Sequence, residues 1–369
     1  MTQHPNRRLS LFEPLTLGGL VLPNRIVMAP LGRARGTPAS REPTGLVAEY
    51  YVQRAAAGLI ISEATHISAD TISRRGTTAI HTEGQVAAWR RVTDAVHEAG
   101  GRIFQQLFHL GRKADPSLLP AGSWPGAPSA IAARAQFATP DGPEPFPIPR
   151  ALQHDDIARL VEAFGVAAAN ARRAGFDGIE IHGANGYLID QFLRDSANQR
   201  YDLYGGDVEG RARFLFEVVE AAAAHWPANR IGVRLSPHPH TDGTADSAPR
   251  RLVRHVAQGL AARGLAYIHL VEPVATAPSE RIAPTVREAF GAPLIVCGGY
   301  DRASADAAVA ENRADLVAFG AGFIANPDLV ERLRRDAPWN APDPSTFYSG
   351  GAAGYIDYPV LRTATATAG

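Results

Sequence analysis

The sequence predicts an α/β protein folded as a single TIM-type (β/α)₈ barrel, and three observations support that class. Eight short apolar runs lie within residues 25–320, and eight is the number of strands that such a barrel needs. Their apolar residues do not alternate cleanly with polar ones, as expected of parallel strands buried on both faces. Longer amphipathic stretches separate most of the runs. A doubly wound sheet is the alternative fold, but no G-x-G-x-x-G motif follows the first strand.

The first predicted element precedes the barrel. Leu15–Leu22 (LTLGGLVL) predicts a β-hairpin that turns at Gly18-Gly19 and caps the N-terminal mouth of the barrel. The barrel strands are then expected, in order, at Arg25–Ala29, Leu59–Ala64, Arg102–Leu107, Gly178–His182, Ile231–Leu235, Tyr267–Val271, Leu294–Gly298 and Leu316–Gly320.

Helices are predicted between these strands. Thr82–Ala99 begins with the capping-box spacing of Thr82 and Gln85 and is followed by two glycines. Asp155–Ala174 carries one apolar stripe at helical spacing. Residues 113–150 form a long insertion after the third strand, rich in proline, alanine and glycine, and such a loop on a barrel is typically a lid or a substrate wall. We expect one domain over residues 1–361 and a disordered tail over residues 362–369.

Composition excludes several classes of function. The formal net charge is zero, which argues against nucleic acid or an anionic membrane as a partner. The single cysteine, Cys297, excludes disulfide frameworks and cysteine-based metal sites. The first ten residues lack the apolar core of a signal peptide, and no apolar run is long enough to span a membrane. We therefore expect a cytoplasmic protein.

Two further signals have simple interpretations. Lys113 is the only lysine, so Schiff-base, pyridoxal phosphate or P-loop chemistry would have to use it. It follows the third strand, where we expect a solvated loop lysine. His238 and His240 could ligate a metal, but no third ligand is evident, and a polar loop without a metal is the preferred interpretation.

Polar residues gather where the predicted strands end, and barrel enzymes place their chemistry there. His182, Asn185 and Tyr187 bring three hydrogen-bonding side chains onto one short loop. Gln106 and Arg234 lie within otherwise apolar strands, where a buried polar group needs a partner. Each residue alone also has a structural interpretation, such as a satisfied buried histidine. Three glycines after the last two strands suggest a backbone anion site, namely Gly298, Gly299 and Gly320.

Beyond these residues, the sequence resembles the old yellow enzyme family over roughly residues 10–360. The matching segments are LPNRIVMAPL, EYYVQRAAAGLIISEAT, GRIFQQLFHLGR, FDGIEIHGANGYLIDQFLRD, NQRYDLYGG, ADLVAFG, FIANPDLVERL and FYSGGAAGYIDYP. The resemblance implies noncovalently bound flavin mononucleotide (FMN) over the barrel mouth and NAD(P)H as the reductant. It also implies a homodimer or homotetramer, since both are common among members.

The resemblance also assigns roles to residues. His182 and Asn185 would hydrogen-bond the carbonyl oxygen of an enone, and Tyr187 would give the proton to its α-carbon. Gln106 would bond the flavin pyrimidine, and Arg234 would face the N1–O2 edge of the ring. Phe108 and Tyr348 would wall the substrate pocket. The other flavin-binding residues would be Pro30, Leu31, Gly32, Ala64, Gly298, Gly299, Phe319 and Gly320.

Two positions depart from the family pattern. Gly32 stands where members with a MAPLTR segment have a threonine that bonds the flavin, and losing that bond costs about 0.5–1.5 kcal/mol. Ala321 stands where FGRPF segments have an arginine near the flavin phosphate, and that loss costs about 1.5–3 kcal/mol. Arg302 is a candidate to replace this charge. We expect flavin to be bound, with an affinity that these two changes weaken.

The sequence thus predicts a flavin-dependent enzyme that reduces the activated C=C bond of α,β-unsaturated carbonyl compounds. Two alternatives remain open at this point. Gly32 and Ala321 could mark a homologue that has lost flavin and uses His182 and Tyr187 for acid–base isomerisation or cyclisation. The scaffold could also serve as a binding protein without catalysis, although the retained polar residues argue against this.

Overall fold

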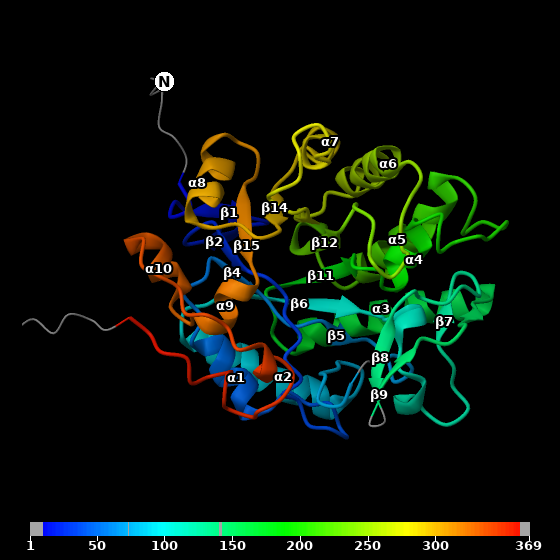
Figure 1. Ribbon diagram of the computed structural model, residues 1–369, viewed down its shortest axis with the longest axis horizontal. Helices are drawn as coiled ribbons and strands as arrows, with labels where there is room; N and C mark the ends of the chain where they lie inside the picture. The colour runs from blue at the N-terminus through cyan, green and yellow to red at the C-terminus, as the bar shows by residue number, and fades with distance from the viewer. Residues whose placement is uncertain (1–9, 73, 140–141, 362–369) are drawn as a thin grey trace, which may run out of the picture.

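The computed structural model describes residues 10–72, 74–139 and 142–361, so the predicted tail Arg362–Gly369 lies outside the described residues. Parallel strands form a closed barrel at the centre of the molecule, because the last strand pairs with the first through Val317 and Ile26 (Figure 1). The predicted barrel and its eight strands are confirmed. The strands are β3 (Ile26–Met28), β4 (Leu59–Ile61), β6 (Ile103–Phe108), β11 (Gly178–Gly183), β12 (Ile231–Leu235), β13 (Tyr267–Val271), β14 (Leu294–Cys297) and β15 (Leu316–Phe319).

The predicted hairpin is also present. Strands β1 (Leu15–Leu17) and β2 (Leu20–Leu22) pair antiparallel, and both turn glycines have positive φ, at 54° and 80°. Leu17 and Leu22 pack into the apolar cluster inside the barrel, together with residues of six strands. The carbonyl of Gly18 accepts a 2.8 Å hydrogen bond from Arg230, which immediately precedes β12. The hairpin therefore caps the end of the barrel where the strands begin.

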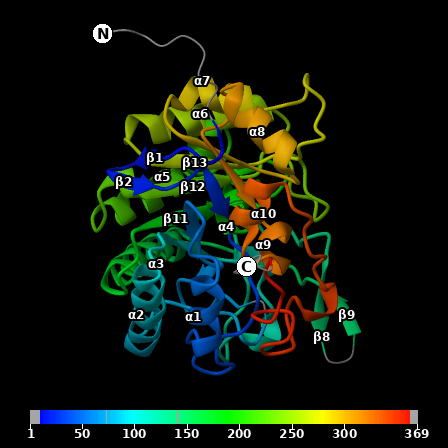
Figure 2. The ribbon, with the colours of Figure 1, turned by 90° about the vertical axis from the view of Figure 1, so that its left-hand side faces the viewer.

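Helices surround the strands and bury a second, larger core against their outer faces. Figure 2 shows α1 (Gly45–Val52), α2 (Glu83–Glu98) and α3 (His154–Arg173) side by side on one flank. The predicted capping box of α2 is present, with Thr82 accepting from the Gln85 amide at 3.3 Å. The other helices are α4 (Leu188–Leu193), α5 (Val208–Ala223), α6 (Pro249–Ala262), α7 (Ala283–Phe290), α8 (Arg302–Ala310), α9 (Ala321–Ala325) and α10 (Leu329–Arg335).

The insertion after β6 folds mainly into short strands and single helical turns. Strands β8 (Gln136–Thr139) and β9 (Gly142–Pro145) form an antiparallel hairpin, and β7 (Gly126–Ala127) pairs with β10 (Arg150–Ala151). Phe137, Phe146 and Lys113 of this region line a cavity that they share with Tyr187. The insertion therefore forms a wall beside the barrel mouth. The remaining short elements are β5 (Thr65–His66) and the 3₁₀ turns Gly111–Lys113, Pro116–Leu118, Ala228–Arg230 and Pro344–Thr346.

Among the helices of the described residues, none has the length and apolar character that crossing a membrane requires.

Candidate active site at the barrel mouth

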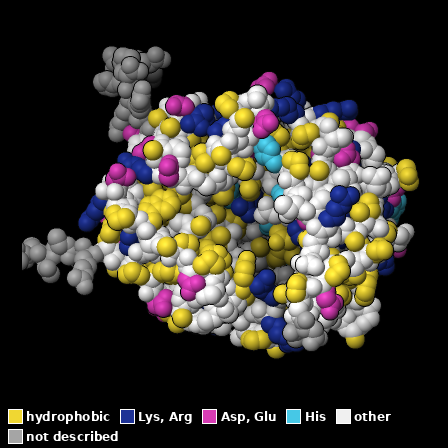
Figure 3. Space-filling model, in the orientation of Figure 1, with side chains coloured by type: hydrophobic (Ala, Val, Ile, Leu, Met, Phe, Trp, Pro, Cys, Tyr) yellow, Lys and Arg dark blue, Asp and Glu magenta, His cyan; other side chains and the backbone are white. Residues whose placement is uncertain are grey.

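A cavity opens where the barrel strands end, and Figure 3 shows this face of the molecule hollowed near its centre. Ten residues expected in the site line it: Pro30, Gly32, Ala64, Gln106, Phe108, His182, Asn185, Tyr187, Arg234 and Tyr348. Five others expected to bind flavin are not among its lining residues and lie in or directly after the flanking strands: Leu31, Gly298, Gly299, Phe319 and Gly320. Four lining residues were not predicted: Ala34, Glu63, Arg74 and Thr77.

His182 is a neutral hydrogen-bond donor at the end of β11. Its Nδ1 accepts the Ala184 amide at 3.2 Å, so the ring proton resides on Nε2. Burial, together with the nearby Arg234 cation, holds the pKa of His182 well below its usual value. At neutral pH the ring therefore offers one N–H to a ligand in the cavity and carries no charge.

Asn185 follows on a strained turn, with φ of +58°. A non-glycine residue tolerates this left-handed conformation only where its surroundings fix it, and asparagine does so more readily than most residues. Two hydrogen bonds hold the backbone here: its N–H donates to Ser236 at 2.7 Å, and its carbonyl accepts from Lys113 at 3.1 Å. The loop is thereby fixed to the neighbouring loops on both sides.

Tyr187 directly precedes helix α4 as its N-cap residue and lies edge-on to two other rings. The centroid of the His182 ring is 5.1 Å from that of Tyr187, and the centroid of Phe108 is 5.5 Å away. Burial raises the pKa of Tyr187 above its ordinary value. The phenol is therefore protonated at neutral pH, and its side chain lines the cavity beside His182 and Asn185.

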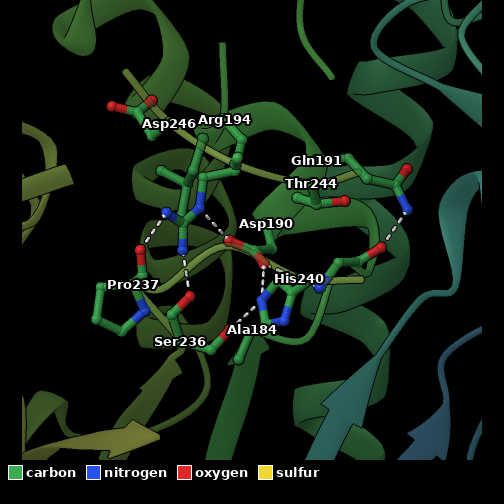
Figure 4. Close-up of polar contacts among 12 residues, drawn as sticks. Ala184, Asp190, Gln191, Arg194, Ser236, Pro237, His240, Thr244 and Asp246 are labelled. Carbon is green, nitrogen blue, oxygen red and sulfur yellow. Dashed lines mark hydrogen bonds and ion pairs between the residues drawn. The ribbon is translucent and has the colours of Figure 1, made fainter. Parts of the chain in front are cut away.

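Beneath this loop, a fully buried carboxylate anchors the backbone (Figure 4). Asp190 accepts from the Gly186 amide at 2.9 Å and from Arg194 Nε at 2.7 Å, and His240 Nε2 lies 3.3 Å from it. Although burial opposes ionisation, the Arg194 guanidinium lowers the pKa of Asp190 to about 2. Ser236 links His240, at 2.9 Å, to the Asn185 amide. Arg194 also bonds the Ser236 and Pro237 carbonyls, so the loop after β11 is joined to the loop after β12.

A second polar network fills the barrel interior below the cavity. Glu180 accepts from Gln106 Nε2 at 2.7 Å, from Tyr267 at 3.1 Å and contacts His269 Nδ1 at 2.9 Å. His269 keeps the pKa of Glu180 low despite complete burial, so the carboxylate is charged. Because Gln106 uses its amide N–H₂ on this carboxylate, its amide oxygen is left to accept from a ligand. The network therefore orients Gln106.

These residues suit a planar ring with hydrogen-bonding edges, as in a flavin. Arg234 is nearly buried at the mouth, and its Nε has no hydrogen-bond partner in the described part of the chain. A Cβ added to Gly32 would meet nothing within 4 Å, so this side of the cavity is open. Gly298 is required where it stands, since a Cβ there would lie 2.1 Å from the Glu272 carbonyl oxygen. The donor set at the mouth thus fits the implied cofactor.

The phosphate side has less side-chain support. Ala321 is the exposed first residue of α9 and contributes no charge. Arg302, the candidate to replace it, bonds Asp306 and the Leu333 carbonyl instead. The structure therefore does not support that replacement, and Gly298, Gly299 and Gly320 remain the expected backbone anion site.

Some site features had no clear sequence signal. Arg74 stacks on the Tyr348 ring, with its guanidinium carbon 3.8 Å from the ring centroid. Glu63 is buried, and burial raises its pKa to about 7. Its position directly before Ala64 is the only hint that the sequence offers.

The structure also shows the contacts of Lys113, His238 and His240. Lys113 is not a solvated loop residue, since its ammonium lies 2.7 Å from Asp242 and its side chain is only 18% exposed. His238 contacts Glu272 at 3.0 Å, whereas His240 contacts Ser236. No group of three or more His, Cys, Asp or Glu side chains within the described ranges is placed to hold a metal ion.

A parallel barrel whose mouth holds a cation, neutral hydrogen-bond donors and flanking glycines suits a flavin-dependent barrel oxidoreductase. Residues 10–340 match the NADH:flavin oxidoreductase / NADH oxidase family, and the chain belongs to that family. The expected old yellow enzyme relationship and the expected flavin and nicotinamide cofactors are thereby confirmed.

Individual relatives agree with this assignment. The chain is 41% identical over 358 residues to a probable flavin mononucleotide-dependent alkene reductase of Leishmania infantum, covering 95% of this chain and 97% of the relative. Morphinone reductase in complex with tetrahydroNAD superposes with a TM-score of 0.91 at 47% identity, covering 96% and 98%. The old yellow enzyme homologue from Zymomonas mobilis has a TM-score of 0.91 at 42% identity, covering 96% and 100%.

Proposed function

We propose that this protein reduces the C=C bond of α,β-unsaturated carbonyl compounds, with FMN as cofactor and NAD(P)H as reductant. One observation carries the proposal: two neutral donors, His182 and Asn185, meet the protonated phenol of Tyr187 at the mouth of the barrel. The relatives named as alkene and morphinone reductases support the same reaction class. No observation favours a homologue without flavin.

The carbonyl oxygen of the substrate binds to His182 and Asn185. Nε2–H of His182 is the donor, because Nδ1 is occupied by the Ala184 amide. Both donors become more effective as negative charge develops on the oxygen, so they stabilise the transition state more than the ground state. The hydrogen bonds that fix Asn185 from both sides keep its amide in place for this task.

Tyr187 holds the proton that the α-carbon receives. Its raised pKa keeps that proton in place at neutral pH, while the cations Arg234 and Arg74 favour the phenolate that remains after transfer. Phe108 and Tyr348 wall the cavity and limit the access of water. When bound, FMN supplies the hydride for the β-carbon and takes it from the nicotinamide.

The cofactor is held by groups that this chain provides at the same mouth. Gln106 accepts from the pyrimidine edge, and Arg234 supplies the cation beside it, with Pro30, Gly32 and Ala64 lining the other side. Leu31 and Phe319 would contribute to the flavin site from the loop after β3 and from β15, and the backbone of Gly298, Gly299 and Gly320 would bind the phosphate. With Gly32 and Ala321 in place of family side chains, we propose weaker FMN binding than in relatives that keep them.

Two measurements test the function. The purified protein should release FMN on heat denaturation, and anaerobic NADPH should bleach the bound flavin. Cyclohexenone should then reoxidise it, giving cyclohexanone. A colourless protein that fails to take up added FMN would contradict the proposal, as would a reduced flavin that enones leave unchanged.

The proposal also covers the domain organisation, the cellular compartment and the oligomeric state. A continuous core from Leu11 to Tyr355 supports one domain over residues 1–361. The solitary cysteine suits a cytoplasmic protein, which fractionation would test. A homodimer or homotetramer is proposed, and light scattering measures it directly.

A further inference from the structure

Lys113, the only lysine of the chain, contacts the loop that carries the proposed donors. Its ammonium donates to the Asn185 carbonyl at 3.1 Å and lies 4.9 Å from the centre of the Tyr187 ring. The same ammonium pairs with Asp242 at 2.7 Å. One side chain thus touches two of the three residues proposed to act on the substrate.

The partner of Lys113, Asp242, connects this contact to the protonation of Tyr187. The carboxylate is almost buried and lies against the same loop, since a Cβ on Gly186 would be 2.2 Å from its Oδ2. Although burial opposes ionisation, Lys113 holds the pKa of Asp242 low, so the carboxylate is charged. That negative charge raises the pKa of Tyr187 and opposes loss of its proton.

Other charges and dipoles also face the phenol from the surrounding elements. Arg234 and Arg74 favour the phenolate, whereas the Tyr348 hydroxyl opposes it. The His182 ring, the nearest titratable group on β11, is neutral. Asp242 is therefore the one carboxylate acting on Tyr187 among these groups, and Lys113 lies directly on it.

We propose that Lys113 is a positioning residue for proton transfer from Tyr187: it neutralises Asp242, faces the phenol ring and fixes the Asn185 carbonyl. The proposal rests on the proposed role of Tyr187 as proton donor. The transferred proton leaves the phenol oxygen for the α-carbon of the substrate, and the phenolate regains a proton from water. A cation over the ring favours that phenolate.

The two partners of this ion pair give opposite predictions. Lys113→Met removes the cation that contacts Asp242 and leaves that carboxylate only the longer-range attraction of Arg112. The pH profile of enone reduction should therefore shift upward by about one unit. The proton-transfer step should slow about three- to thirtyfold. Asp242→Asn removes the opposing charge, so the profile should shift downward. If the ion pair were only a structural link, both substitutions would slow enone reduction, and they would not shift the pH profile in opposite directions.

The experiment measures single-turnover reoxidation of the reduced holoenzyme by cyclohexenone against pH. Lys113→Arg is the matched control and should stay within about twofold of the parent, because it keeps the positive charge. The double variant Lys113→Met/Asp242→Asn should return toward the parent profile, since both charges are gone. Tyrosinate absorbance of the flavin-free protein, titrated with and without Tyr187→Phe, reports the phenol pKa independently of activity.

The outcomes separate the two proposals. If Tyr187→Phe leaves reoxidation unchanged, the proposed function of Tyr187 fails. If Tyr187→Phe slows it while Lys113→Met and Asp242→Asn shift the profile in the same direction, or not at all, the role of Lys113 is overturned. Opposite shifts in both the kinetic profile and the absorbance titration establish it.

Discussion

The loop after β11 and the loops after β14 and β15 lie at the same end of the barrel, yet they present functional groups by different means. The first offers side chains, and Ser236, Lys113 and Asp190 fix its backbone from below and from both sides. The other two offer backbone amides of glycines, with Ala321 contributing no charge. In the proposed function, side chains would therefore specify the substrate side, whereas cofactor binding would depend on contacts spread over the whole mouth.

The first way to test this contrast is to remove the phenol. Tyr187→Phe should slow reoxidation of the reduced enzyme by enones about 10²- to 10⁴-fold, the usual contribution of a general acid. Reduction of the flavin by NAD(P)H should stay close to the parent rate, because that step needs no proton from Tyr187. Stopped-flow measurement of the two half-reactions separates them. A loss shared equally by both halves would mean that the ring serves only to shape the cavity.

A second substitution removes the carboxylate that anchors the loop after β11. Asp190→Asn leaves the buried Arg194 without its carboxylate, and breaking such a buried pair destabilises a protein by about 3–5 kcal/mol. In the parent, the folded-state pKa of about 2 lies below the unfolded value, so this stabilisation is present above pH ~4. It is lost as pH falls through the folded pKa. Urea unfolding should show this contribution as a gap in unfolding free energy between parent and variant that narrows as pH falls, because other carboxylates with lowered pKa, such as Glu180 and Asp242, add the same acid-dependent loss to both proteins.

On the cofactor side, the contrast predicts that added side chains will increase the affinity for FMN. Ala321→Arg places a cation at an exposed position beside the glycine loops and should tighten FMN binding about ten- to a hundredfold. Gly32→Thr should add a smaller factor, since its side chain enters open space. Quenching of FMN fluorescence by the flavin-free protein measures both. Unchanged affinity in Ala321→Arg would show that the backbone amides already satisfy the phosphate.

The sequence predicted the barrel and much of its mouth because those features follow local rules. Gln106, His182 and Arg234 are polar residues at the ends of apolar strands, a pattern visible without a structure. Lys113 was misjudged because its partner, Asp242, lies 129 residues further along the chain. Arg74 was missed for the same reason, since Tyr348 lies on the C-terminal segment. Long-range packing, rather than local pattern, decides such pairings.

Glu63 depends both on local sequence pattern and on long-range packing. Its substitution gives the smallest effect that we predict, a pH-dependent change in the free energy of unfolding. Its backbone continues from β4, a local feature, but its charge state depends on the cluster of Arg33, Arg35 and Tyr355 packed over it. Burial raises its pKa to about 7, above the unfolded value of about 4.3. The folded state therefore binds a proton that the unfolded state releases, and the contribution of Glu63 to stability should fall as pH rises between these two values.

Glu63→Gln keeps the shape of the side chain and removes its titration. The unfolding free energy of the parent minus that of the variant should decline between pH ~4 and ~7. This difference cancels the opposite contribution of buried histidines such as His66 and His182, whose pKa values burial lowers. Glu98→Gln, on the last residue of the surface helix α2, is the matched control and should not reproduce this pH-dependent difference. A difference between parent and Glu63→Gln that stays flat over this range would mean that Arg33 and Arg35 keep the Glu63 carboxylate ionised. The cofactor side of the mouth would then carry a permanent negative charge next to Gly32.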